Sequence, residues 1–293
     1  MDDGLLVAIC TFNRSPLLAK ALRSLAVQDA PPTFPILVVD NASTDDTAAV
    51  VAEFQKTLPN LSYVLETRRG LSNARNRALA DCREPLIAYL DDDAIASPGW
   101  VRAMTGAFAE LGPDVAAIGG RILPIWEAPK PDWFSAELED YVSVLDFGDA
   151  TMVLADRGVV GANMAFRTEA LRAGGGFSDK LGRKGKRLLG NEELAVVRNL
   201  RARGLAIGYC GAAVVDHLVP KDRMTHAWIL DRFKQQGVSD AILLLRIEGD
   251  LRAFIDRSRY AFREGFLTKG APDFVRRRHR TYLHGAALGA LFG

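Results

Sequence analysis

The sequence predicts an α/β protein built on a mostly parallel, Rossmann-like sheet with helices on both faces. Apolar runs and helical patterns alternate four times between Leu5 and Leu90, and helices follow the runs closely. Within each run the residues are almost continuously apolar and do not alternate with polar ones, as expected of parallel strands that are covered on both faces. Polar residues come directly after the first, second and fourth runs. Beyond residue 220 the pattern becomes largely helical, which predicts a helical C-terminal extension.

Each element of the N-terminal part has its own signal. The runs LLVAIC, PILVVD, LSYVLE and PLIAYL are short and rich in Val, Ile and Leu, which is typical of buried strands. Apolar residues at helical spacing follow the first run, and Ser15 before Pro16 is a favourable helix start. Strands and helices are expected, in chain order, over residues 5–10, 15–27, 35–40, 44–54, 61–66, 71–82 and 85–90.

The pattern is less regular after Ala94. A Pro- and Trp-containing stretch over residues 124–141 predicts a surface loop or lid, and a helix is expected to end at Gly204. The other expected elements are a strand within 112–123, a strand and helix within 158–171, and one or two strands within 206–220. We therefore expect a core domain over residues 1–220 and a helical region over residues 221–293.

Composition narrows the function classes. Lys and Arg number 37 against 36 Asp and Glu, so a formal charge of +1 predicts no nucleic-acid partner. The three cysteines are widely spaced beside apolar runs and are expected to be free thiols in a reducing compartment. The first residues lack a basic stretch before an apolar one, so a cytoplasmic location is expected. No apolar run reaches about 18 residues, which excludes a membrane-spanning helix of the usual kind.

The C-terminal tail has two interpretations. A basic cluster, RRRHR at residues 276–280, is followed after Thr281 by the apolar segment YLHGAALGALFG. Such a segment can lie on the inner, anionic face of a membrane as a peripheral contact. It can equally be a solvated basic turn followed by a helix that packs on the protein. We expect the region beyond Pro220 to pack on the core, to form a homodimer or to contact a membrane.

Three consecutive carboxylates follow the fourth predicted strand: Asp91, Asp92 and Asp93. Like charges this close raise one another's pKa, so a divalent cation such as Mg²⁺ or Mn²⁺ is their natural partner. In doubly wound sheets, ligands bind beyond the carboxyl ends of the strands. The turn TFNR after the first strand and Asp40 after the second should lie at that same edge. An acidic turn or a helix cap is the alternative interpretation.

The sequence also resembles a known family. The segments ICTFNR, LVVDNASTDDT, GLSNARNRAL, AYLDDDAIASPGW, GANMAFR, GNEELAVVRNLRARG and VVDHLVP occur in the order and spacing of the family 2 glycosyltransferases. The resemblance covers residues 4–220 and implies the GT-A fold. It also implies inverting transfer of a sugar from a UDP- or GDP-type donor to a glycan, lipid-linked or small-molecule acceptor, with Mn²⁺ or Mg²⁺. No Gln-any-any-Arg-Trp segment follows, so the resemblance is to non-processive members.

The resemblance assigns donor and metal residues position by position. Asp91 and Asp93 match the outer positions of an Asp-any-Asp motif, with Asp93 the expected direct metal ligand, and His217 matches a histidine that completes the metal shell. An ordinary buried histidine is the alternative for His217. The residues expected to contact the nucleotide and donor are Thr11, Asn13, Arg14, Asp40, Asn41, Arg75, Asp91 and Asp92.

The resemblance also nominates catalytic and acceptor residues. An inverting transfer needs a carboxylate that deprotonates the acceptor hydroxyl. Counting back from Gly204 aligns Glu193 with that base, and Glu192 is the other candidate because the usual pair is Glu-Asp. Both glutamates would also be favourable at a helix N-terminus without any catalytic role. The residues expected to line the sugar and acceptor are Gly161, Ala162, Asn163 and Trp133, with Trp126 as a further aromatic that either stacks on a sugar or anchors the loop.

Two other functions stay open from the residues alone. A sugar nucleotidyltransferase would also use an α/β sheet and Mg²⁺, but CTFNRSP lacks a Gly-rich, basic signature after the first strand. A nucleotide- or glycan-binding module without turnover would keep the fold. The presence of the Asp triplet, Glu193 and His217 together favours an enzyme.

Overall fold

The computed structural model describes residues 4–29, 34–185, 187–268 and 272–292. The chain forms two compact units, which are described separately below. The first comprises Met1–Ile125, Val142–Phe177 and Glu193–Leu218. The second comprises Trp126–Tyr141, Ser178–Glu192 and Val219–Gly293. The chain therefore passes from one unit to the other several times, and the second unit includes more than the C-terminal region.

The N-terminal half of the sheet is parallel. β1 pairs in parallel with both β2 and β4, and β2 pairs in parallel with β3. Every residue of β2 and β4 is buried, in agreement with their continuously apolar sequences, whereas β3 lies at the edge and is partly exposed. Thr11 stands opposite Asp40 at the carboxyl ends of β1 and β2. The four strands are β1 (Leu5–Thr11), β2 (Ile36–Asp40), β3 (Leu61–Leu65) and β4 (Leu86–Leu90).

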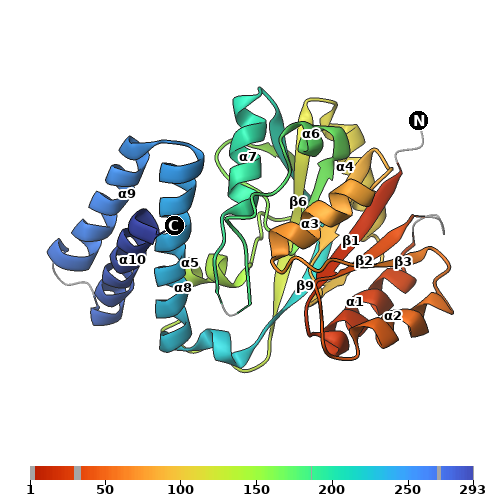
Figure 1. Ribbon diagram of the computed structural model, residues 1–293, viewed down its shortest axis with the longest axis horizontal. Coiled ribbons are helices and arrows are strands. Elements are labelled where there is room, and N and C mark those ends of the chain that lie inside the picture. Colours follow the sequence, from red (N-terminus) through yellow and green to blue (C-terminus); the bar gives the residue numbers. More distant parts are fainter. Residues whose placement is uncertain (1–3, 30–33, 186, 269–271, 293) are drawn as a thin grey trace. The chain divides into compact units, whose positions relative to one another are not determined.

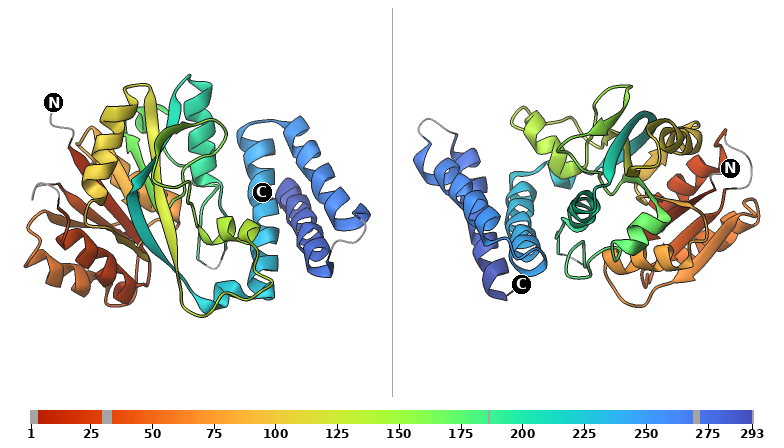
Figure 2. Two further views of the ribbon diagram at one scale, coloured as in Figure 1. Left: turned by 180° about the vertical axis from the view of Figure 1, so that it is seen from behind. Right: turned by 90° about the horizontal axis from the view of Figure 1, so that it is seen from above.

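Helices cover both faces of this sheet. Figures 1 and 2 show α3 over one face and α4 over the opposite one. α1 begins at Ser15 with a proline in its first turn, as the sequence predicts, and buries Leu18, Leu22 and Leu25 at helical spacing. The helices of this unit are α1 (Ser15–Ala26), α2 (Thr47–Gln55), α3 (Leu71–Asp81), α4 (Trp100–Leu111), α6 (Thr168–Ala173) and α7 (Glu192–Ala202), whose first residue belongs to the second unit.

The other half of the sheet is antiparallel. The strand order is β3-β2-β1-β4-β8-β6-β9-β5, and β7 pairs with β9. The pairs β4 with β8, β6 with β8, β5 with β9 and β7 with β9 all run antiparallel, so the expectation of a mostly parallel sheet holds only for β1 to β4. These strands are β5 (Ala94–Ala96), β6 (Val115–Trp126), β7 (Thr151–Leu154), β8 (Asn163–Arg167) and β9 (Ala206–Val219).

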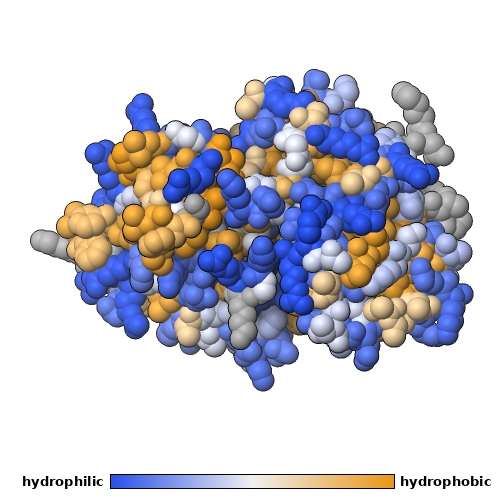
Figure 3. Space-filling model, viewed as in Figure 1, coloured by the Kyte–Doolittle hydropathy of each residue, from blue (hydrophilic) through white to orange (hydrophobic). Residues whose placement is uncertain are grey.

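The second unit is mainly helical. α8 and α10 pack closely, since a Cβ added to Gly237 or Gly285 would collide with the backbone of the facing helix. The apolar tail segment is part of α10, and Figure 3 shows apolar surface gathered around α9 and α10. No helix in the described residues is long and apolar enough to cross a membrane. The α-helices are α5 (Ala136–Glu139), α8 (His226–Ala241), α9 (Leu251–Phe262) and α10 (Asp273–Phe292). Shorter helical segments are the 3-10 helices η1 (Asp140–Val142), whose last residue belongs to the first unit, and η2 (Lys221–Met224), and the π-helices η3 (Ile242–Ile247) and η4 (Arg263–Leu267).

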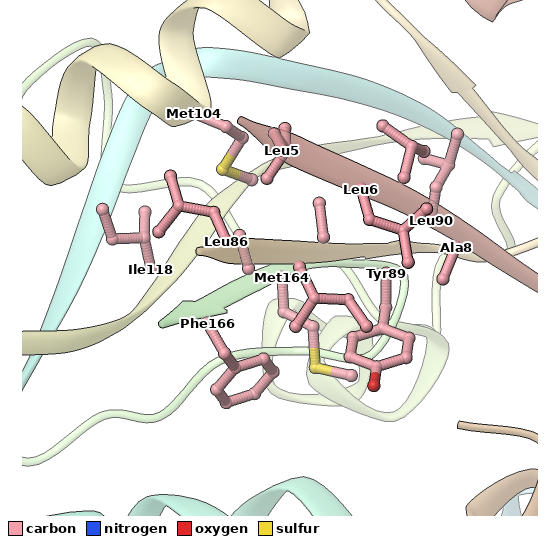
Figure 4. Close-up of a cluster of buried hydrophobic side chains, with 14 of the residues drawn as sticks. Leu5, Leu6, Ala8, Leu86, Tyr89, Leu90, Met104, Ile118, Met164 and Phe166 are labelled. Atoms are coloured by element: carbon pink, nitrogen blue, oxygen red, sulfur yellow. The ribbon is translucent and has the colours of Figure 1, made fainter. Parts of the chain in front are cut away.

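The core of the first unit lies on both sides of β1 and β4. Figure 4 shows Met104 of α4 beside Leu5 on one side of the strands. On the other side, Tyr89 lies near Phe166 of β8, and the two rings meet edge to face with centroids 6.2 Å apart. Val7, Ala8 and Ile9 have no exposed surface, so β1 is the centre of this core. This rigid centre holds the strand ends at which polar residues collect.

Candidate active site

Polar side chains from distant parts of the first unit meet beyond the carboxyl ends of β1 and β4. Thr11 ends β1, and the Asp triplet follows β4. His217, in β9, stands opposite Ala94 of β5, and the backbone N–H of Leu218 donates to the Asp93 carbonyl oxygen at 3.0 Å. The parallel and antiparallel halves of the sheet thus contribute to one cluster, as the sequence predicts for the triplet and the TFNR turn.

Asp92 is a buried carboxylate that residues of the first strand end and the following turn contact directly. The Thr11 hydroxyl donates to its Oδ2 at 2.7 Å, and Arg14 Nη1 donates to its Oδ1 at 3.0 Å. The same Arg14 nitrogen donates to Asp93 Oδ2 at 2.8 Å. Burial raises the pKa of Asp92 to about 6, against the opposing effect of the Arg14 guanidinium. Arg14 therefore compensates two neighbouring carboxylates at once.

Asp91, Asp93 and His217 form a group with the chemistry of a metal site. Each offers one ligand atom, and these atoms all lie within 4.8 Å of one another. His217 Nε2 is 3.2 Å from Asp93 Oδ1, and both side chains are almost fully buried, whereas the Asp91 side chain is 32% exposed. Two carboxylates and one imidazole can hold a divalent cation of the Mg²⁺ or Mn²⁺ kind. A cation would also offset the cost of burying adjacent carboxylates.

Arg75 connects this group to Glu193. Its side chain, on α3, is only 2% exposed; Nη1 donates to Glu193 Oε1 at 3.1 Å, and Nη2 lies 3.6 Å from Asp91 Oδ1. The guanidinium also lies 5.4 Å from the centroid of the Phe177 ring. A Cβ on Gly161 would collide with the ends of both the Arg75 and the Glu193 side chains, so a larger residue here would displace them. The sequence indicates a role for Arg75 near the donor but not this link between two carboxylates.

Glu192 and Glu193 differ in their surroundings. Both belong to the first turn of α7. Glu192 is 3% exposed and belongs to the second unit, whereas the Glu193 side chain is 18% exposed and is held by Arg75 in the first unit. A base has to be reached by its substrate, so this geometry favours Glu193 over Glu192.

The residues after β2 mainly join loops to one another. Asp40 is buried and accepts two hydrogen bonds of 2.8 Å, from the Ser43 backbone N–H and from the Tyr63 hydroxyl. Burial and this bond to Asp40 raise the pKa of Tyr63 to about 12. The Asn13 side chain accepts from the backbone N–H of Thr44 at 2.7 Å. No sequence motif marks Tyr63. Its hydrogen bond to Asp40 becomes evident only from its place on β3, the edge strand next to β2.

Asn41 holds the loop after β3. Its Nδ2 donates to the carbonyl oxygens of Glu66 at 3.1 Å and Arg68 at 2.8 Å, and its Oδ1 accepts from the Gly70 N–H at 2.7 Å. Nine-tenths or more of the Asn41 surface is buried. Asn41 thus shapes the wall of the site through the backbone, and the expected contact with a nucleotide stays a prediction.

The residues expected at the sugar and acceptor belong to both units: Gly161, Ala162 and Asn163 to the first, and Trp133 to the second. Asn163 has no exposed surface: its Oδ1 accepts from Trp100 Nε1 at 2.8 Å, and its Nδ2 donates to the carbonyl oxygens of Arg121 and Ala213. These bonds use its amide to join β8 to β6 and β9, and the expected contact with the sugar stays a prediction. Ala162, by contrast, accepts through its carbonyl oxygen from the Asp91 N–H at 3.4 Å and borders the site.

Trp133 lies in the second unit within an aromatic cluster. Its ring centroid is 4.0 Å from that of His226 and 5.2 Å from that of Phe274. Trp126 meets Phe134 edge to face in the same unit, with centroids 5.9 Å apart. Both tryptophans thus pack against other aromatic rings of the second unit, and the expected sugar contacts stay predictions.

Comparison with known proteins identifies relatives over most of the chain. The model of the family described as glycosyl transferase family 2 matches residues 6–175. The glucosyl-dolichyl phosphate glucuronosyltransferase of Haloferax volcanii is 26% identical over 240 residues, which cover 81% of this chain and 76% of that protein. The succinoglycan biosynthesis protein ExoM of Rhizobium meliloti is 27% identical over 312 residues, covering 98% of this chain and 92% of that protein.

Solved structures share the fold. A mannosyltransferase from Pyrobaculum calidifontis, PcManGT in complex with GDP-Man and Mn²⁺, is similar with a TM-score of 0.60 and 23% identity, over 99% of this chain and 75% of its own. TarS of S. aureus, residues 1–349 in complex with UDP-GlcNAc, is similar with a TM-score of 0.57 and 14% identity, over 97% of this chain and 91% of its own. Both likenesses are evidence of the fold.

Proposed function

Because the chain belongs to glycosyl transferase family 2 and is a glycosyltransferase of the GT-A fold, we propose that it moves a sugar from a nucleotide-diphosphate donor to an acceptor hydroxyl with inversion. The observation that carries this proposal is the group of Asp91, Asp93 and His217. It lies one side chain away from Glu193, since Arg75 contacts both Asp91 and Glu193.

The metal group would hold Mn²⁺ or Mg²⁺ beside the diphosphate of the donor. Bound there, the cation stabilises negative charge on the leaving diphosphate. Arg14 is part of the same cluster and supplies a second positive charge for the diphosphate. Thr11 and Asp92 border the space in which the ribose would lie, and Asp40 and Asn13 hold the loops on which the base would rest.

Glu193 is the proposed base, and Glu192 is the alternative. The Glu193 carboxylate takes the proton of the acceptor hydroxyl while the hydroxyl oxygen forms a bond to the anomeric carbon. The bond from that carbon to the diphosphate oxygen breaks, and the nucleoside diphosphate leaves with its electron pair. Arg75 donates a hydrogen bond to one oxygen of the Glu193 carboxylate.

The relatives support a proposal for the donor and acceptor classes. PcManGT was solved with GDP-Man and TarS with UDP-GlcNAc, which supports a GDP- or UDP-sugar donor here. One similar protein is a glucosyl-dolichyl phosphate glucuronosyltransferase, and another is a succinoglycan biosynthesis protein. We therefore propose a growing glycan, carried on a lipid in the first instance, as the acceptor class, with small molecules as the alternative.

Nucleotide release from a panel of UDP- and GDP-sugars tests this function. With Mn²⁺ and a lipid-linked glycan acceptor, we expect release of UDP or GDP that chelation abolishes and added cation restores. Consumption of a nucleoside triphosphate would identify a nucleotidyltransferase instead. Binding without release would identify a module that lacks turnover.

Variants of the two glutamates test the base. Glu193→Gln should keep donor affinity and lose about 10²–10⁴-fold in turnover, the usual contribution of a general base. Glu192→Gln should retain more activity, and Asp81→Ala, which removes an exposed ion pair with Arg77 on α3, should leave turnover unchanged. A larger loss for Glu192→Gln than for Glu193→Gln would reverse the assignment.

We also propose a peripheral membrane contact at the second unit, through α9 and its neighbours. Leu251, Ile255 and Phe262 are 59%, 38% and 49% exposed and recur at helical spacing on one face of α9. Phe266 continues the stripe and stacks on Phe262. Residues 246–293 carry ten Lys and Arg against five Asp and Glu, while the rest of the chain carries 27 against 31. An apolar stripe in a positively charged segment suits an anionic bilayer surface.

Sedimentation with vesicles tests this contact. We expect binding to phosphatidylglycerol vesicles, weak binding to phosphatidylcholine vesicles, and loss of binding in Leu251→Ser/Phe262→Ser. Val153→Ser, at an exposed apolar residue of β7, is the matched control and should bind like the original chain. Equal binding of all three proteins would rule out this surface. A homodimer through the same face would appear as a doubled mass in solution without vesicles.

A further inference from the structure

A buried polar network joins the helices of the second unit to the loop that precedes α7. Asp240, on α8, is 2% exposed. Its Oδ1 accepts from Asn191 Nδ2 at 2.7 Å and from Gln236 Nε2 at 2.8 Å. Its Oδ2 accepts from the Tyr282 hydroxyl of α10 at 2.6 Å and pairs with Arg257 Nε of α9 at 2.5 Å. One carboxylate therefore connects three helices to one loop residue.

The loop is attached to α8 at further points. Gln236 Nε2 also donates to Asn191 Oδ1 at 2.8 Å, so the Asn191 side chain is held from both ends. The Gly190 N–H donates to the buried Ser239 hydroxyl at 3.0 Å, and Arg232 Nη1 donates to the Leu188 carbonyl oxygen at 3.3 Å. The attached segment ends one residue before α7 begins.

The backbone of Asn191 shows why its side chain matters. Its φ of 72° lies in the left-handed region, where glycine is the least strained residue. Asparagine tolerates this conformation and, unlike glycine, supplies an amide that bonds both Asp240 and Gln236. Burying these polar groups among helices is costly unless all are paired, so apolar packing would be the simpler way to stabilise the unit alone. The network therefore fixes the position of the loop before α7 relative to the helices of the second unit.

We propose that Asp240 and Asn191 are positioning residues for the catalytic base. They hold the loop at Asn191, and the chain continues from there through Glu192 to Glu193 at the start of α7. Movement of the loop would change the direction of the Glu193 carboxylate without affecting the residues that bind the donor. This inference rests on the proposed base and adds to it a role for the helices of the second unit in turnover.

A pair of substitutions tests the proposal. Asn191→Gly keeps the backbone conformation and removes the anchor, and Asp240→Asn keeps the shape and removes the charge. For each we expect about a tenfold lower kcat, with the dissociation constant for donor nucleotide and Mn²⁺, measured by calorimetry, unchanged. Both substitutions act on the same hydrogen bond, between Asn191 and Asp240. The double variant should therefore lose no more kcat than either single variant.

Hydrogen exchange provides a readout that does not depend on turnover. Amides of residues 188–195 should exchange faster in Asn191→Gly and Asp240→Asn than in the original chain. Glu137→Ala removes an exposed ion pair with Arg278 in the same unit and should change neither exchange in this segment nor kcat. Additive losses in the double variant, a weakened donor affinity or unchanged exchange would overturn the proposal. If the original chain transferred no sugar but exchange responded as expected, the proposed function would fail while the anchor stood.

Discussion

The parallel and antiparallel halves of the sheet present polar side chains in different places. In the parallel half they stand at strand ends, as Asp40 and Asp91 do. In the antiparallel half, Asn163 is the first residue of β8 and His217 lies two residues before the end of β9, and both are almost fully buried. Asn163 has all its amide groups bonded to protein, whereas His217 faces Asp93. Burial alone therefore does not separate these two side chains, whereas their bonding partners do.

The largest effect is expected at the metal group. Asp93→Asn removes a charge but keeps the shape, and we expect a loss of about 10³-fold in metal-dependent transfer with an unchanged melting temperature. Turnover at saturating Mn²⁺ measures the first and thermal unfolding the second. Activity near that of the original chain would show that the strand-end carboxylates of the parallel half do not hold the cation.

A large loss of stability, without a specific loss of catalysis, is expected at Asn163. Asn163→Ala leaves the Trp100 indole N–H and two buried carbonyl oxygens without their partner, at a cost of about 3 kcal/mol in the free energy of unfolding. Urea unfolding measures this cost. The folded variant should bind donor nucleotide normally, and a selective loss of sugar specificity would instead return Asn163 to the binding site.

His217 should show the opposite behaviour to Asn163. His217→Gln should weaken Mn²⁺-supported nucleotide binding by about 10–100-fold, because an imidazole ligand is lost, and should change stability less than Asn163→Ala does. Titration of activity with Mn²⁺ gives the first quantity. If raising the Mn²⁺ concentration does not restore turnover, His217 acts in some way other than as a ligand.

A smaller effect is expected at the edge of the parallel half. Tyr63→Phe leaves one oxygen of Asp40 without its 2.8 Å hydrogen bond and should cost about 1 kcal/mol of stability. Donor affinity should fall only slightly, since the Asp40 bond to Ser43 remains. Calorimetric titration with UDP and GDP would detect a change confined to one base if Asp40 recognises it.

The smallest effect is a pH dependence at Glu66. Hydrogen bonds from Arg68 hold the pKa of Glu66 below its usual value, so the folded state favours the ionised form. This stabilisation is present at neutral pH and disappears as the pH falls through the lowered pKa. It should be under about 1 kcal/mol because Arg68 is largely exposed. Glu66→Gln should therefore match the original chain in acid and be slightly less stable at pH 7.

The same contrast explains how far the sequence could predict the structure. Each strand from β1 to β4 is a continuous apolar run, so the parallel half and the cluster at its edge could be placed from residue patterns. β5 and β7 are too short to show a period, and α4 follows an irregular stretch after the triplet that hides where its helical pattern begins. Antiparallel pairing and the Arg75–Glu193 contact join residues far apart in the chain, and no local pattern encodes them.

The repeated passage of the chain between its two compact units affects how it can be shortened. Residues 126–141 and 178–192 belong to the second unit, although each is inserted between segments of the first. A chain cut after residue 220 would keep Trp133 but lose His226 and Phe274, whose rings surround it. Such a fragment would expose aromatic surface and be prone to aggregate. The catalytic and helical parts are therefore expected to be inherited, expressed and replaced together, and not exchanged as independent modules.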